Sequence, residues 1–259
     1  AAEPIVRSVR KAASVFRRTW SLYRRHGGAL IVLAALVFVP LGLVDALSTR
    51  LTANSLSDDA VEIVAVGATA LALGATSLLG DIFYSGAVAI WLAGASDERT
   101  AAPLQLARRI AFARLLLVDL LYVAIVIAGL ALFVIPGLLA FVWLTLAGPV
   151  VEIEHRGVLA ALRRSFELVR GSFVAVALVV FPVEVGGDMV SEAVGHAVHA
   201  ELGESLLAVW AAEAAVNVLV TPIFAVAVVL LTLDLIAAKE GIPARLNRSP
   251  VAAEIAGRA

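Results

Sequence analysis

The sequence contains no cysteine in its 259 residues. Disulfide bonds, thiolate metal sites and cysteine nucleophiles are therefore excluded. Charge is also scarce, since Asp, Glu, Lys and Arg form 16% of the chain, against about 25% in an ordinary soluble domain. Hydrophobic residues reach 61%, and a soluble core of this size cannot hide that excess because a folded chain must still present polar surface to water. We therefore predict an all-α integral membrane protein that forms one transmembrane domain over residues 1–259.

Several enzyme signatures are missing as well. The chain has no His-Glu-x-x-His, no Gly-x-Ser-x-Gly, no phosphate-binding loop and no Gly-x-Gly-x-x-Gly. Their absence argues against an enzyme without excluding one embedded in the membrane, and we expect no cofactor. His196 and His199 have a spacing compatible with a surface metal site, but a solvated outer helix explains them more simply, so no metal site is predicted.

Six apolar segments are candidates for spans, which need about 20 mostly apolar residues. The predicted spans are approximately residues 29–47, 68–95, 115–135, 138–153, 172–194 and 208–236. Pro136-Gly137 is expected to form the turn between the third and fourth spans. The fourth is short, so a hairpin that turns within the outer leaflet stays an alternative. The fifth is interrupted by Pro182 and is expected to end early at Gly186-Gly187.

The basic residues are segregated along the chain. With six spans and a cytoplasmic N-terminus, every Lys and Arg except Arg50 falls on the inner side. The positive-inside rule predicts this distribution, which places both termini in the cytoplasm. The abundance of Ala, Val and Arg favours a bacterial source, so we expect a multi-pass protein of a bacterial cytoplasmic membrane. Because topology accounts for the basic residues, nucleic acid is not expected as a partner.

The inner segments have the pattern of basic amphipathic helices, the first predicted over residues 5–26. Residues 16–24 (FRRTWSLYR) match residues 162–170 (LRRSFELVR) at four of nine positions, and residues 107–114 form a looser third copy. Either the chain contains three units, each an interfacial helix before a helical hairpin, or basic amphipathic helices merely resemble one another. The candidate contacts to lipid headgroups are Arg17, Arg18, Arg108, Arg109, Arg163 and Arg164. Simple anchoring and orientation of the bundle is the more economical interpretation.

The most distinctive stretch is residues 149–171, P-V-V-E-I-E-H-R-G-V-L-A-A-L-R-R-S-F-E-L-V-R-G. It resembles a group of bacterial membrane proteins that includes the membrane domain fused to some glycerophosphoryl diester phosphodiesterases. The matching residues are Pro149, Glu154, Gly157, Ala161, Leu162, Ser165, Phe166, Leu168 and Gly171. The resemblance implies family membership and no activity, since the phosphodiesterase module is a separate soluble domain. Locally, Glu154 and Gly157 suit the start of a helix, and Ser165 can form a local hydrogen bond.

Polar residues inside the predicted spans are candidates for function because they are costly in lipid. One stripe, at four-residue spacing, is Ser77, Asp81 and Ser85, and a second is Glu213, Asn217 and Thr221. No Lys or Arg lies within a predicted span to pair with these acids. A polar path for cations or protons is one interpretation, and neutral carboxyls that link helices are the favoured one. For Glu184, Asp188 and Glu192 we expect external water beyond an early end of the fifth span.

The leading functional prediction is a non-enzymatic membrane protein that binds or helps to move a lipid or small amphiphile, or supports a membrane partner. The expected partners are membrane lipids, anionic on the cytoplasmic side, and the sequence does not indicate which protein would be supported. One alternative is an ion- or proton-coupled transporter that uses Asp81 and Glu213. The other is a membrane-embedded enzyme that modifies lipids.

Overall fold

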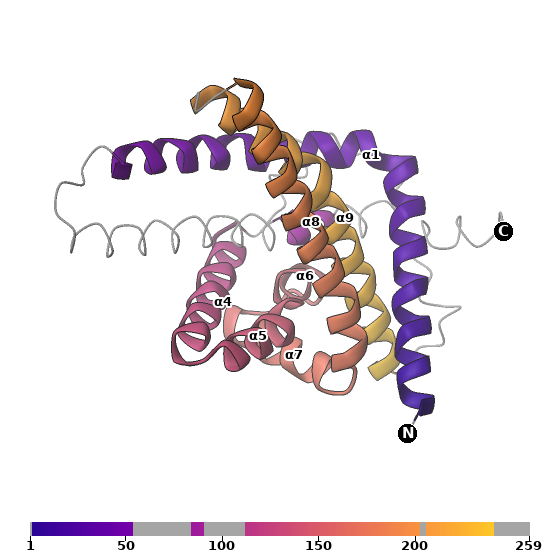
Figure 1. Cartoon of the computed structure of the whole chain (residues 1–259). Coiled ribbons are helices and arrows are strands. Elements are labelled where there is room, and N and C mark those ends of the chain that lie inside the picture. Colours follow the sequence, from indigo (N-terminus) through magenta and orange to yellow (C-terminus); the bar gives the residue numbers. More distant parts are fainter. Residues whose placement is uncertain (1, 54–83, 91–111, 203–205, 241–259) are drawn as a thin grey trace.

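The computed structural model describes residues 2–53, 84–90, 112–202 and 206–240. These residues are helical apart from short connections, and they contain no strand, so the all-α prediction is confirmed for this part of the chain. The helices, drawn in Figure 1, are α1 (Ala2–Ala53), α4 (Phe112–Leu132), α5 (Val134–Leu144), α6 (Ala147–Ile153), α7 (Val158–Arg170), α8 (Phe173–Leu202) and α9 (Leu206–Glu240).

Among the residues that the structure describes, five segments are long and apolar enough to cross a membrane. They are Ile5–Val39, Ala113–Leu132, Val134–Ile153, Phe173–Val194 and Ala214–Glu240. Each overlaps one predicted span. The remaining prediction, residues 68–95, lies mostly outside the described residues, of which 84–90 are helical. The fold is therefore compatible with a multi-pass membrane protein.

Helix α1 joins the predicted interfacial helix 5–26 and the predicted span 29–47 in one continuous helix. Figure 1 shows that α1 is bent about midway, with its first half alongside α9 and its second half across the bundle. Gly27 and Gly28 stand at the midpoint of its sequence, and no atom lies within 4 Å of a Cβ placed on either. Glycine lowers the cost of such a bend because it has no side chain. Whether the first half lies at a membrane surface stays a prediction.

Helices α4 and α5 form a tight hairpin. Phe133, with φ −162° and ψ 150°, is the non-helical residue between them. The predicted turn at Pro136-Gly137 is wrong, because both residues lie in the first turn of α5, where the missing N–H of proline is tolerated. Close packing explains the early return of the chain. A Cβ built on Gly129 would lie 2.9 Å from the Cα of Gly137, so only glycines allow this approach.

The predicted fourth span is divided into α5 and α6 by a turn at Thr145 and Leu146. Pro149 accounts for the break, because its ring cannot accept a helical geometry with the carbonyl four residues earlier, at Thr145. Residues 147–152 of α6 are buried in the protein. The chain therefore returns from the turn through the short helix α5, and α6 follows as a separate helix.

Helices α8 and α9 run side by side in Figure 1, and α1 packs along α9. The expectation that the fifth span ends at Gly186-Gly187 is wrong, since α8 continues through Pro182 and both glycines to Leu202. Gly187 faces α9, where its Cβ would meet Val220 at 3.2 Å, so packing between the helices supports the backbone there. The buried residues of α1, residues 84–90 and α4 to α9 form one hydrophobic core.

Candidate functional site at the end of helix α9

The distinctive segment 149–171 folds as α6, a short turn and α7. Glu154 ends α6 as its C-cap, and His155 adopts a left-handed φ of 50°. Gly157, in extended conformation, is the N-cap of α7, and Gly171 is its C-cap. The prediction that Glu154 belongs to the start of a helix is wrong, because Glu154 ends α6. Gly157 does stand at the start of α7, as predicted. The motif residues on the buried side of this segment are Pro149, Ala161, Leu162, Ser165 and Leu168.

Ser165 fixes α7 against α5. Its Oγ donates a hydrogen bond to the carbonyl oxygen of Trp143 at 2.7 Å, and Phe166 packs edge-on against the Trp143 ring at 5.1 Å between centroids. The predicted local hydrogen bond of Ser165 is thus replaced by one between helices. The carbonyl of Trp143 is available because the last four carbonyls of a helix have no partner within it.

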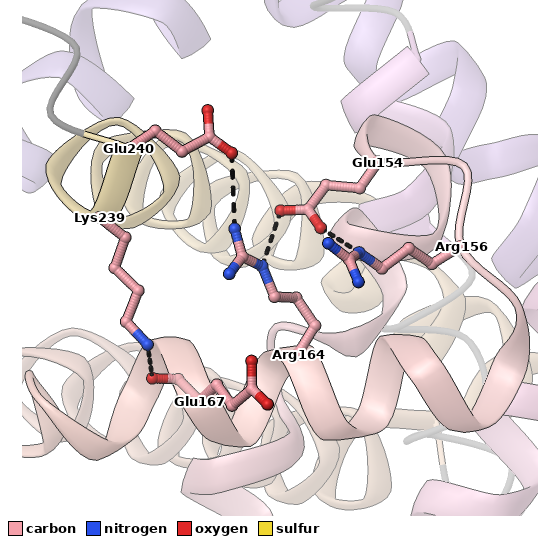
Figure 2. A network of polar contacts seen from close by, with 6 residues as sticks. All are labelled: Glu154, Arg156, Arg164, Glu167, Lys239 and Glu240. Atoms are coloured by element: carbon pink, nitrogen blue, oxygen red, sulfur yellow. Dashed lines mark hydrogen bonds and ion pairs between the residues drawn. The ribbon is translucent and has the colours of Figure 1, made fainter.

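Arg164 is the centre of the polar network in Figure 2. Its Nε donates to Glu154 Oε1 at 2.9 Å, and its Nη2 lies 3.5 Å from Glu240 Oε1. The second oxygen of Glu154 accepts from Arg156. The side chains of Arg164 and Glu154 are 15% and 12% exposed. This mostly buried pair ties the end of α6, the middle of α7 and the last turn of α9 together.

Lys239 adds a second tie between α7 and α9. Its Nζ donates to the backbone carbonyl of Glu167, as Figure 2 shows. Glu167 also accepts a 3.3 Å hydrogen bond from Arg163, one helical turn away on the same helix. That side chain of Arg163 is 84% exposed, so this pair contributes little to stability. The two adjacent arginines of α7 therefore have opposite surroundings.

Arg18 makes the corresponding contact from α1. Its Nη1 donates to Asp234 Oδ1 at 3.1 Å and its Nη2 donates to Oδ2, which gives a bidentate pair between α1 and α9. Bidentate pairing matches the planar guanidinium to the planar carboxylate. The hydroxyl of Tyr23 also donates to the Leu219 carbonyl of α9 at 3.1 Å. Both sequence-matched segments thus place one arginine against acids in the C-terminal part of α9.

The exposure of the side chain agrees at six of the nine equivalent positions of the two matched segments 16–24 and 162–170. The agreeing pairs are Arg17 and Arg163 (exposed), Arg18 and Arg164 (partly buried), Thr19 and Ser165 (buried), Ser21 and Glu167 (partly buried), Leu22 and Leu168 (buried), and Arg24 and Arg170 (exposed). Trp20, in contrast, is exposed, whereas its equivalent Phe166 is partly buried. The doublet of arginines in each segment therefore points one side chain toward α9 and the other away from the protein.

The predicted polar stripes are described only in part. Ser77 and Asp81 lie outside the described residues, as do Arg108, Arg109 and the side chain of Glu213. Ser85 is buried and Asn217 is partly buried. A polar path between the two stripes stays a prediction.

Sequence reasoning assigned no site role to three acids. Asp234 lies inside a predicted span, and its partner Arg18 comes from the basic segment of another helix, which a search within spans could not find. Asp119 and Glu152 are almost fully buried, in α4 and α6. Asp119 had a signal, because it is the only Asp, Glu, Lys, Arg or His between Arg114 and Glu152.

Of the two histidines of the candidate metal site, only the side chain of His196 is described, and that of His199 lies outside the described residues. His196 lies 3.7 Å from Glu192, one turn earlier, and both side chains are exposed. No group of three or more Asp, Glu or His side chains in the described ranges is placed to hold a metal ion. The carboxylates at the end of α9 instead face arginines.

Comparison of the chain with protein families, with characterised proteins and with solved structures gives no match. The resemblance of residues 149–171 to the phosphodiesterase membrane domains stays a prediction. Function must consequently be argued from the paired and exposed arginines themselves.

Proposed function

We propose that this chain is a multi-pass membrane protein that binds anionic lipid headgroups with the outward-facing arginines of two matched helical segments. One observation carries the proposal: adjacent arginines are divided between two roles. Arg164 is 15% exposed and paired with two carboxylates, whereas Arg163 is 84% exposed. The proposed headgroup contacts are therefore Arg163 and its equivalent Arg17, while Arg164 and Arg18 hold the bundle.

The exposed face of α7 has the character of a helix at a lipid interface. Leu159, Arg163 and Arg170 share this face by their spacing along the helix, and all three are exposed. A basic helix face with an apolar side chain beside it can sink into the headgroup layer and pair with phosphates. Charged residues of either sign are costly in hydrocarbon, so the ion pairs around α7 also favour a position at the membrane boundary.

The matched face of α1 has the same chemistry. Arg17, Trp20 and Arg24 are exposed and share one side of the helix. Tryptophan is enriched at membrane interfaces because its ring is apolar and its N–H is polar. The segregation of basic residues along the sequence makes the cytoplasmic leaflet the proposed location of this surface. Anionic lipid there attracts each nearby basic side chain by about 1 kcal/mol.

The test is a lipid titration of the full chain followed by native mass spectrometry. Phosphatidylglycerol and phosphatidylcholine are added separately to the purified protein, and bound lipids are counted. In the double variant Arg17→Gln/Arg163→Gln, the loss of about 2 kcal/mol of attraction should weaken phosphatidylglycerol binding by about 30-fold. Phosphatidylcholine binding should change little, because its headgroup carries no net charge.

The matched control is Arg18→Gln/Arg164→Gln, which removes equal charge from the inward-facing positions. This control should keep most of its phosphatidylglycerol affinity wherever the protein remains folded, as judged by circular dichroism. Equal lipid affinity in wild type and the outward double variant would refute the proposal. A protein that co-purifies in place of lipid would favour the role of supporting a membrane partner.

A further inference from the structure

The tip of the α4–α5 hairpin is the most exposed apolar surface among the described residues. Leu132, Phe133, Val134 and Ile135 are 64–71% exposed. The twenty residues from 123 to 142 include no polar side chain. A turn that emerged into water would place large apolar side chains against solvent with nothing to compensate.

The far end of the hairpin is fixed at the level of α7. Ser165 of α7 donates to the Trp143 carbonyl at 2.7 Å, and the Trp143 ring also contacts Phe173 at the start of α8, at 6.3 Å between centroids. Helix α7 carries the charged network of Figure 2, which cannot lie in hydrocarbon without a large cost. Trp143 therefore marks one boundary of the membrane, which is a common position for tryptophan.

The depth of the tip follows from helix geometry. Phe133, the residue directly before α5, precedes Trp143 by ten residues, which corresponds to about 15 Å at about 1.5 Å per residue. The hydrocarbon core is about 30 Å thick. A hairpin that starts at the boundary consequently reaches only about the middle of the bilayer.

The other limb agrees with this depth. The rings of Tyr122 and Phe141 are in contact at 6.4 Å, so the two limbs run level at this point. Arg114 is exposed and lies eight residues before Tyr122, on the side away from the tip. The first turns of α4 can thus reach the charged boundary while its last turns accompany α5.

We propose that the α4–α5 hairpin enters the bilayer from the α7 side and turns back near the midplane, with its tip packed against lipid acyl chains. The hairpin then replaces the third and fourth crossings predicted from sequence. A hairpin that turns back, like a pair of full crossings, returns the chain to the side of the membrane from which it came. The basic residues before and after it therefore lie on one side in both topologies, and the tip itself carries no charge. The distribution of charge alone therefore cannot distinguish a crossing pair from this hairpin.

At three positions of the turn the backbone nitrogen needs no further hydrogen-bond acceptor. The N–H of Phe133 donates to the Gly129 carbonyl at 2.9 Å, and the N–H of Gly137 donates to the Phe133 carbonyl at 3.4 Å. Pro136 has no N–H to satisfy. Such internal hydrogen bonds favour a position in hydrocarbon, because each unsatisfied backbone group there costs several kcal/mol.

The inference rests on the proposed position of α7 at the headgroups, and the chain suits a direct test because it has no cysteine. Single variants Phe133→Cys and Ile135→Cys carry a nitroxide spin label in vesicles of phosphatidylglycerol and phosphatidylcholine. Collisions with oxygen, which concentrates in hydrocarbon, are compared with collisions with a water-soluble nickel complex. Leu159→Cys, on the exposed face of α7, is the matched control at the headgroup level.

We expect oxygen collisions to dominate at the tip and a depth about 15 Å below the boundary, half of the hydrocarbon core. Dominant nickel collisions at the tip would overturn the inference, because the turn would then be in water. Low accessibility to both reagents would also overturn it, because protein would cover the tip. A deep label at Leu159 would instead show that the placement of α7, and with it the proposed function, is wrong.

Discussion

Segments 16–24 and 162–170 share a sequence pattern and the exposure of their arginines but differ in how they are held. The first continues into the remainder of the 52-residue helix α1, whereas the second is the central part of the 13-residue helix α7, bounded by Gly157 and Gly171. Arg18 faces Asp234 in a bidentate pair, while Arg164 is shared between Glu154 and Glu240. The local sequence pattern therefore sets which face of each helical segment is buried. The number and burial of the carboxylates from distant parts of the chain set how strongly that face is held.

The largest expected effect is at Arg164. Substitution Arg164→Gln removes the pair with Glu154, which is 12% exposed and would keep only Arg156 as a charged partner. Leaving a mostly buried carboxylate short of a partner should destabilise the protein by about 3 kcal/mol. Thermal unfolding in detergent measures this loss. Arg163→Gln, the neighbouring control, should change stability by less than about 0.5 kcal/mol. Similar losses in both variants would remove the distinction between inward and outward arginines.

A smaller effect is expected at Arg18. Its pair with Asp234 is more exposed, with side chains 31% and 25% accessible, so solvent screens the charges. We expect Arg18→Gln to cost about 1 kcal/mol, and Asp234→Asn a similar amount. The double variant should then lose little more than either single variant, because one interaction is removed in all three. Full additivity would show that the two side chains act independently.

The smallest effects compare the two buried hydroxyls. Ser165→Ala loses the hydrogen bond to Trp143 and should cost about 1 kcal/mol. Thr19 Oγ1 is buried and has no hydrogen-bond partner among the described residues. Thr19→Val keeps the shape of the side chain, so it should leave stability unchanged or raise it by up to about 1 kcal/mol. Chemical denaturation of both variants in one detergent measures the difference. A loss at Thr19 equal to that at Ser165 would contradict it.

Much of the fold could be predicted from the periodicity and the hydropathy of the sequence. The all-helical class agrees with the described part of the structure, and its five apolar segments each overlap a predicted span. The errors lie at glycine and proline. The sequence predicts a turn at Pro136-Gly137 and the end of a span at Gly186-Gly187, yet both pairs lie inside helices. Glycine permits a turn, but it equally permits close packing between helices, as Gly137 against Gly129 shows. Sequence alone does not say which of the two occurs.

Less of the candidate site could be predicted from the sequence. The sequence identifies the arginine doublets as candidates for headgroup contacts, but not which arginine of each doublet is paired and which is exposed. This difference depends on Asp234 and Glu240, which lie far along the chain from Arg18 and Arg164. Asp119 has no polar residue four positions before or after it, so this single acid in an apolar helix does not form the stripe that marks the other candidates.

The helical class, the excess of apolar surface and the amphipathic faces of the two matched segments follow from the amino-acid sequence, because these properties depend on composition and on the period of an α-helix. Packing between helices sets which arginine of each doublet meets a carboxylate and that the chain turns at Phe133. It also sets that Ser165 is bonded to Trp143. Those outcomes depend on which helices lie side by side, and contacts between residues distant in sequence have no local signature.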